Sequence, residues 1–256
     1  MTSEIFATPP GGGKSNVFDV RAYGARGDGA ANDTAAVQRA IDACHAAGGG
    51  RVFLGAGVFT CGTLYLKSRV ELFLDAGAIL RGSPRRADYT TDGNAPYDVM
   101  PIRRTTYPLS AAHLICAYHA ENIAIRGRGA IDGNGQAFFG PPNEGTLLRR
   151  FSIPEWRPGH TLAFCECRDV LVEGVQLLNS PTYTIWPFGC ERVRIQGVTI
   201  RNPPETPNGD GIDPTACRDV LITQCLIEAR MIAWPSTAAR ATACLAANRA
   251  PVKMLS

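Results

Sequence analysis

The chain has 256 residues, of which 45% are hydrophobic and 19% charged, with a formal net charge of +3 and a pI near 8.4. This composition is typical of a globular protein with one large domain or two small ones. The chain contains no Lys/Arg-rich run of the kind that binds nucleic acid and no apolar run long enough to cross a bilayer, so we expect neither a nucleic-acid nor a membrane partner.

The opening MTSEIFATPPGGGKSN lacks the basic and apolar regions of a secretory signal. We therefore expect residues 1–15 to form a flexible tail and the chain as written to be cytoplasmic. Secretion stays open for a chain whose N-terminus extends beyond the one given.

A helix is predicted over residues 34–47. Val37, Ile41 and Cys44 recur at helical spacing, Asp33 stands at the N-cap position, and the run Gly48–Gly50 ends the helix. A helix in this place can cover the open end of the repeats that follow.

Four segments of the chain resemble one another. Their starts are 47, 23 and 27 residues apart, and they read ENIAIRGRGAIDG, RDVLVEGVQLLNS, ERVRIQGVTIRNP and RDVLITQCLIEAR, beginning at Glu121, Arg168, Glu191 and Arg218. RVELFLDAGAILRGS, from Arg69, extends the pattern towards the N-terminus. A period in the twenties, built from short strands of alternating polarity with a Gly or Asn corner, is typical of a solenoid.

The repeats predict an all-β fold, a right-handed parallel β-helix with an N-terminal capping helix. Strands are expected at 170–172, 175–177, 193–195 and 198–200, so that Val170, Val193 and Val220 stack coil on coil. The β-helix domain is assigned to residues 16–228 and is expected to be incomplete at its C-terminal end.

The nine cysteines are an odd number scattered from Cys44 to Cys244, which indicates reduced, mostly buried thiols. Cys165 and Cys167 form the tightest pair, but no His or second pair stands at ligand spacing. We expect no metal and no other cofactor.

The stretch NGDGIDP places two carboxylates, Asp210 and Asp213, three positions apart between two strand-like runs. Hydrolysis of a glycoside with inversion needs a carboxylic acid and a carboxylate about 6.5–9.5 Å apart. Residues one coil apart in a β-helix lie about 4.8 Å apart at the backbone, so a partner of Asp210 is expected one coil later on the same face.

Residues 16–228 resemble the polygalacturonase family, glycoside hydrolase family 28, in the order of their motifs. The resemblance is carried by FDVRAYGARGDGAANDTAAVQRAIDA, GRVFLGAGVFTCGTLYLKSRVELFLDAGAILRGS, GAIDGNG and NSPTYTIWPFGCERVRIQGVTIRNP, leading into PNGDGIDP. It implies a right-handed parallel β-helix that hydrolyses α-galacturonosyl-type linkages in pectin with inversion and without a metal. The implied partner is a pectic oligo- or polysaccharide.

The family's Asn-x-Asp motif matches Asn208 to Asp210, with Gly209 where Thr is usual. The resemblance implies that Asp210 is catalytic and helps to activate water, while the acid is the first Asp of a Gly-Asp-Asp on the next coil. Here Arg230, Met231 and Ile232 take that place, and no Gly-His-Gly or Arg-x-Lys follows.

Substrate contacts are expected at Asn208 and Asp213, beside Asp210, and at Tyr183 and Trp186, whose rings can stack on sugar faces. Arg157 can meet a uronate carboxylate, which a guanidinium grips in bidentate fashion, but an exposed charge on the coil is the commoner interpretation of such a residue.

Residues 229–256 lose the strand-and-corner alternation and contain no acidic residue after Glu228. Two interpretations stay open: a C-terminal capping helix with Ser236 as N-cap, or a shifted reading frame after about residue 229. Reading the codons of Arg-Met-Ile-Ala-Trp from their third base can give Asp-Asp-Cys-Leu, which restores the acid pair.

The sequence therefore predicts a pectin-directed glycoside hydrolase by descent, of doubtful activity because the second carboxylate pair is missing. The alternatives are a non-catalytic polysaccharide-binding β-helix and a calcium-dependent pectate lyase. Endo against exo action, galacturonan against rhamnogalacturonan, and the oligomeric state stay open.

Overall fold

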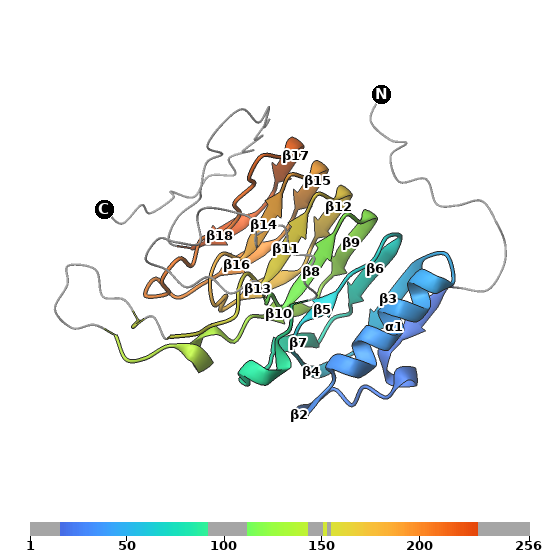
Figure 1. The fold of residues 1–256 in the computed structure, drawn as a ribbon, viewed down its shortest axis with the longest axis horizontal. Helices are drawn as coiled ribbons and strands as arrows, with labels where there is room; N and C mark the ends of the chain where they lie inside the picture. The colour runs from blue at the N-terminus through green and yellow to red at the C-terminus, as the bar shows by residue number, and fades with distance from the viewer. Residues whose placement is uncertain (1–15, 92–111, 143–150, 153–154, 230–256) are drawn as a thin grey trace.

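A computed structural model describes residues 16–91, 112–142, 151–152 and 155–229 of the chain. The tail predicted at 1–15 lies outside the described residues, as do residues 230–256 and the two interpretations of them. The described strands form three parallel sheets, and successive coils stack along one axis (Figure 1). Helix α1 (Thr34–Ala46) lies at one end of this stack. The fold is the predicted right-handed parallel β-helix.

Sheet A contains the strands that open most of the repeated segments. Its strands, in order, are β1 (Val17–Asp19), β3 (Gly50–Leu54), β6 (Val70–Leu74), β9 (Glu121–Gly127), β12 (Arg168–Glu173), β15 (Glu191–Gln196) and β17 (Arg218–Thr223).

Sheet B follows each strand of sheet A after a corner. Its strands are β2 (Asp28–Asn32), β4 (Gly57–Cys61), β7 (Ala78–Gly82), β10 (Ala130–Asp132), β13 (Gln176–Leu178), β16 (Thr199–Arg201) and β18 (Leu226–Glu228).

Sheet C is the shortest sheet, and its strands precede those of sheet A in the chain. They are β5 (Leu64–Tyr65), β8 (Ile115–Tyr118), β11 (Leu162–Cys165) and β14 (Ile185–Phe188). Ile212 and Thr215 continue this sheet by single bridges to Ile185 and Phe188. The described connections contain the short 3-10 helices η1 (Val20–Tyr23), η2 (Arg86–Asp88) and η5 (Gly135–Phe138).

Stacked apolar side chains form the core. In sheet A, for example, the positions Val52, Leu72, Ile125, Val172 and Ile195 pair in succession and are fully buried. The predicted stack of Val170, Val193 and Val220 is confirmed by the register. Alternation of buried and half-exposed residues in strands such as β6 and β7 places one side of the strand in the core.

The predicted helix is observed as α1, and its buried face includes Val37, Ile41 and Cys44 as expected. Asp33 stands at the N-cap position, but its carboxylate makes no capping hydrogen bond to the helix, so that part of the prediction is wrong. The carboxylate instead accepts from the backbone N–H groups of Arg26 and Gly27, at 2.7 and 3.0 Å. The loop that contains Arg26 and Gly27 lies beside the start of the helix and takes up the carboxylate. Near the same end of the helix, Asn32 Oδ1 accepts a hydrogen bond from Thr34 N at 3.0 Å.

The eight described cysteines are free thiols, and all but Cys225 are buried. Among the described residues, no cluster of three or more His, Cys, Asp or Glu side chains is arranged to hold a metal ion. None of the described helices has the length and apolar character needed to span a membrane.

Candidate functional site

The parallel register of sheet C places Asp210 and Asp213 beside aromatic residues of the preceding coil. Ile185 pairs with Ile212, so Asp213 follows in register with Trp186. Thr184 N and Thr184 Oγ1 both donate to the Asp210 carbonyl at 2.9 Å, which aligns Asp210 with the start of the Tyr183 coil. Both Asp side chains are buried, each with an exposed fraction of 5%.

A column of stacked rings leads along the coils to Asp210. The ring centroids of His113 and His160 lie 5.0 Å apart, and those of His160 and Tyr183 lie 5.1 Å apart with nearly parallel planes. Trp186 contacts the same column, its centroid 4.8 Å from that of His160. Trp186 stands in register with Asp213, and the charges of Asp210 and Asp213 act on the Tyr183 hydroxyl.

The two histidines in this column are neutral. Burial lowers the pKa of His113 to about 3, and burial, with the charge of neighbouring groups, lowers the pKa of His160 well below its ordinary value. His113 Nδ1 accepts from the backbone N–H of His160 at 2.8 Å, so its proton is on Nε2. Neutral rings can stack closely because no charge opposes them.

The carboxyl group of Asp213 is strongly perturbed by its surroundings. Burial, and secondarily the negative charge of Asp210, raise the pKa of Asp213 to about 8. No hydrogen-bond partner for Asp213 Oδ2 is present among the described residues. A carboxyl group in this state keeps its proton at neutral pH.

The side-chain oxygen of Asn208 points into the protein, towards the buried Arg157. Its backbone is left-handed, with φ of 57°, and its Oδ1 accepts a hydrogen bond from Arg157 Nη2 at 2.8 Å. Arg157 is fully buried, so the expectation that it grips a uronate at the surface is wrong. Three hydrogen bonds to neighbouring turns hold the guanidinium inside.

Asn202 was missed by sequence reasoning, although it supports the carboxylate loop. Its side-chain N–H groups donate to Thr184 Oγ1 at 2.7 Å and to the Gly209 carbonyl at 3.1 Å, while its oxygen accepts from Ser180 N. The Asn stands at the corner of a repeat, where an Asn is expected for its turn conformation alone. Only the contacts between coils reveal its second role.

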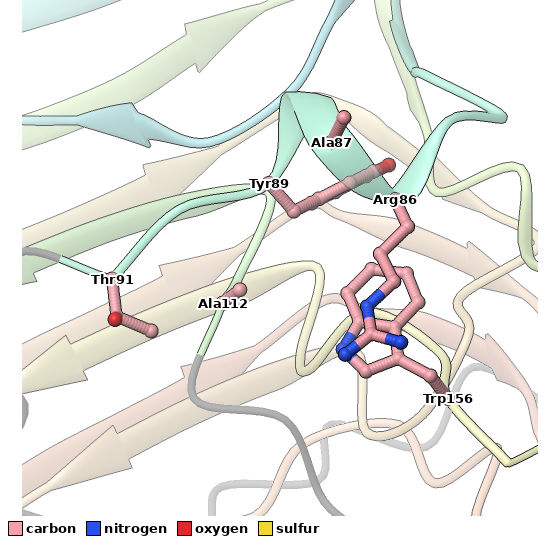
Figure 2. Close-up of a pocket in the computed structure, with 6 residues that line it drawn as sticks. All are labelled: Arg86, Ala87, Tyr89, Thr91, Ala112 and Trp156. Carbon is pink, nitrogen blue, oxygen red and sulfur yellow. The ribbon is translucent and has the colours of Figure 1, made fainter.

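A cavity of about 580 Å³ opens near the start of the ring column, beside Ala112. Figure 2 shows the Arg86 guanidinium over the Trp156 indole, and the charged carbon lies 5.2 Å from the ring centroid. Tyr89 lines the same cavity and packs edge-on against Trp156 at 5.8 Å. A cation beside aromatic rings is chemically suited to an acidic sugar.

The described residues end at residue 229, one position after strand β18 of sheet B. Arg230, Met231 and Ile232, which stand where the partner of Asp210 was expected, lie outside the described part of the chain. The site roles assigned to Asp210, Asp213, Asn208, Tyr183 and Trp186 therefore stay predictions.

Solved structures and curated relatives share this architecture. The family 28 exopolygalacturonase of Yersinia enterocolitica matches with a TM-score of 0.66 and 26% identity, over 83% of this chain and 43% of that one. A probable polygalacturonase of Vitis vinifera is 28% identical over 80% of this chain and 41% of its own length. An exo-poly-alpha-D-galacturonosidase of Dickeya chrysanthemi is 40% identical over 46% of this chain and 20% of its own length.

The fold is a parallel β-helix, and its repeats carry the Asp210 motif in the region that a family model matches. The model of glycosyl hydrolases family 28 matches residues 86–230, and a model described as rhamnogalacturonase A/epimerase, pectate lyase-like matches residues 17–84. The chain belongs to glycosyl hydrolases family 28. It spans less than half the length of the curated relatives named above.

Proposed function

We propose that this chain is a pectin-directed glycoside hydrolase in which Asp210 orients the attacking water. The observation that carries the proposal is the buried pair Asp210 and Asp213, held beside the Tyr183 and Trp186 rings within the matched region. The names of the relatives, polygalacturonase and exo-poly-alpha-D-galacturonosidase, support a galacturonan as substrate.

The chemistry requires a proton donor on the far side of the glycosidic bond from the water. Arg230, Met231 and Ile232 supply no carboxyl group where the family carries its acid. General acid catalysis contributes about 10²–10⁴-fold, so we expect the chain as written to hydrolyse polygalacturonate too slowly to detect.

A reducing-end assay on polygalacturonate tests both statements. It compares the chain as written, a chain with the alternative reading frame restored from Ala229 and Arg230 onward, and the restored chain with Asp210→Asn. We expect activity only in the restored chain. Clear turnover by the chain as written would contradict the missing-acid argument, and an unaffected Asp210→Asn variant would contradict the role of Asp210.

A non-catalytic polysaccharide-binding β-helix is the second candidate, favoured by the same absence of an acid at 230–232. Calorimetric binding of oligogalacturonates without turnover, in both the written and the restored chain, would favour this candidate. Unsaturated products that form only with calcium would identify a lyase instead.

A further inference from the structure

Arg157 is a buried cation without a carboxylate among its described hydrogen-bond partners. Its side chain is fully buried, and burial lowers its pKa only to about 10, so it stays charged at neutral pH. Burying a guanidinium costs several kcal/mol unless its N–H groups are bonded. The Nη groups of Arg157 are bonded, whereas its Nε has no partner among the described residues, so the bonds offset the cost of burial only in part.

These bonds join three consecutive coils at the turns that precede sheet C. Arg157 lies three residues before His160, and its Nη1 donates to the carbonyls of Pro181 at 2.9 Å and Pro207 at 2.7 Å. Pro181 precedes the Tyr183 position, and Pro207 precedes the Asp210 position. One side chain therefore sets the spacing of the turns from which the ring column and the carboxylate start.

The third hydrogen bond of Arg157 is made to Asn208, the first residue of the Asn-x-Asp motif. Arg157 Nη2 donates to Asn208 Oδ1 at 2.8 Å, and Asn208 adopts a left-handed backbone that costs energy unless its surroundings hold it. The centroid of the Phe139 ring lies 5.8 Å from the guanidinium carbon, close to the outer limit of a cation–π contact. A lysine cannot reproduce two donors of fixed separation.

We propose that Arg157 is a positioning residue, whose planar guanidinium holds Asn208 and the turn before Asp210 in the geometry that the reaction requires. The inference rests on the proposed role of Asp210. Arg157 itself is buried and does not touch substrate.

The titration of Asp213 provides a readout that does not need turnover. Its pKa of about 8 has two causes, burial and the charge of Asp210, and the charge of Arg157 is not among them. A change in this titration after replacement of Arg157 therefore reports the loop geometry. Trp186 lies next to Asp213 in register and can report the titration by fluorescence, once Trp156 and Trp234 are replaced by Phe.

The experiment measures the fluorescence titration midpoint in the full chain, with Asp213→Asn to assign it. In Arg157→Met and Arg157→Lys we expect the midpoint to fall by about one pH unit or more, because the loosened turn admits water to Asp213. Arg192→Met is the matched control, since it removes a bidentate pair with Asp169, at 2.7 and 2.8 Å, on a different turn. It should lower the melting temperature and leave the midpoint unchanged.

Midpoints that stay at the parent value in both folded Arg157 variants would overturn the proposal and leave Arg157 a stabilising residue only. If neither variant folds, Asn208→Ala decides, because it removes one contact and keeps the cation: a lowered midpoint supports positioning and an unchanged one refutes it. A chain without hydrolytic activity can still give either result, so failure of this inference and failure of the proposed function are distinguishable.

Discussion

At the scale of single residues, the state of Asp213 follows from where the coil places it. The sequence shows a carboxylate three positions after Asp210 in a glycine-flanked stretch, which by itself describes an ordinary acidic loop. The coil buries this side chain beside Trp186 and close enough to Asp210 for the two charges to interact. A proton held at neutral pH is therefore a property of the fold around the residue.

The stability of the protein should depend on this proton. Between the ordinary pKa of 3.8 and the folded value of about 8, native Asp213 keeps a proton that the unfolded chain releases. The native state then binds more protons, so the contribution to stability is complete below pH 3.8 and is lost as the pH rises to about 8. A tenfold difference in proton affinity between the folded and the unfolded chain corresponds to about 1.4 kcal/mol.

The substitution Asp213→Asn should remove this loss of stability with rising pH. We expect the free energy of unfolding of the variant, relative to the parent, to rise steadily between pH 4 and pH 8 in urea titrations, because the parent alone weakens over that range. A constant difference between the two proteins across this range would show that Asp213 ionises normally in the folded state.

At the scale of elements, helix α1 closes the stack by hydrogen bonding as well as by packing. Strand β5 is the first strand of sheet C, so its outer edge has no neighbouring strand among the described residues. The Gln38 side chain takes that place, since Gln38 Oε1 accepts from Tyr65 N at 2.8 Å and Gln38 Nε2 donates to Tyr65 O at 3.1 Å. An amide side chain reproduces the donor and acceptor of a peptide and covers an edge that would otherwise invite aggregation.

Gln38→Met should destabilise the protein by about 1–3 kcal/mol, because it leaves the two Tyr65 backbone groups without partners while it keeps the volume of the side chain. Chemical denaturation measures the effect. Asp42→Ala serves as the control, since it removes the half-exposed pair with Lys67 at 2.7 Å and the bond from Gln38 Nε2 at 3.0 Å but keeps both bonds between Gln38 and Tyr65. It should cost at most about 1 kcal/mol. Equal losses in the two variants would argue against the edge-covering role of Gln38.

At the scale of the whole molecule, the two ends of the solenoid differ within the described residues. The first coil lies against α1, whereas no described strand pairs with the outer edges of β17 and β18. Leu226 on β18 is 50% exposed, and Ile222 and Ile227 are only partly buried. An open parallel edge with apolar side chains is a template for association.

We expect the chain to self-associate through this end. Sedimentation velocity should show oligomers for the parent chain, and Leu226→Lys should shift the distribution towards the monomer, because a charge on an edge strand opposes pairing. Lys67→Leu, at the other end of the stack, should leave the distribution unchanged. A monodisperse parent of 27.4 kDa would instead support the capping-helix interpretation of residues 229–256.

The sequence by itself determined the solenoid, because burial of Val, Ile and Leu at each repeat imposes a period that is readable in the chain. It also determined the position of α1 to within one residue, and the place of the Asp210 motif within the repeat. These features depend on local patterns of polarity, and such patterns can be recognised from the order of neighbouring residues alone.

Only the tertiary structure decided which residues support the site. Arg157 and Asn208 are 51 positions apart, and Asn202 and Thr184 are 18 apart, so their contacts depend on the number of residues in the corners and on the register of the coils. The same register buries Asp213 and stacks His113 on His160 from 47 positions away. Burial and hydrogen bonding between coils are long-range quantities, and composition or periodicity cannot specify them.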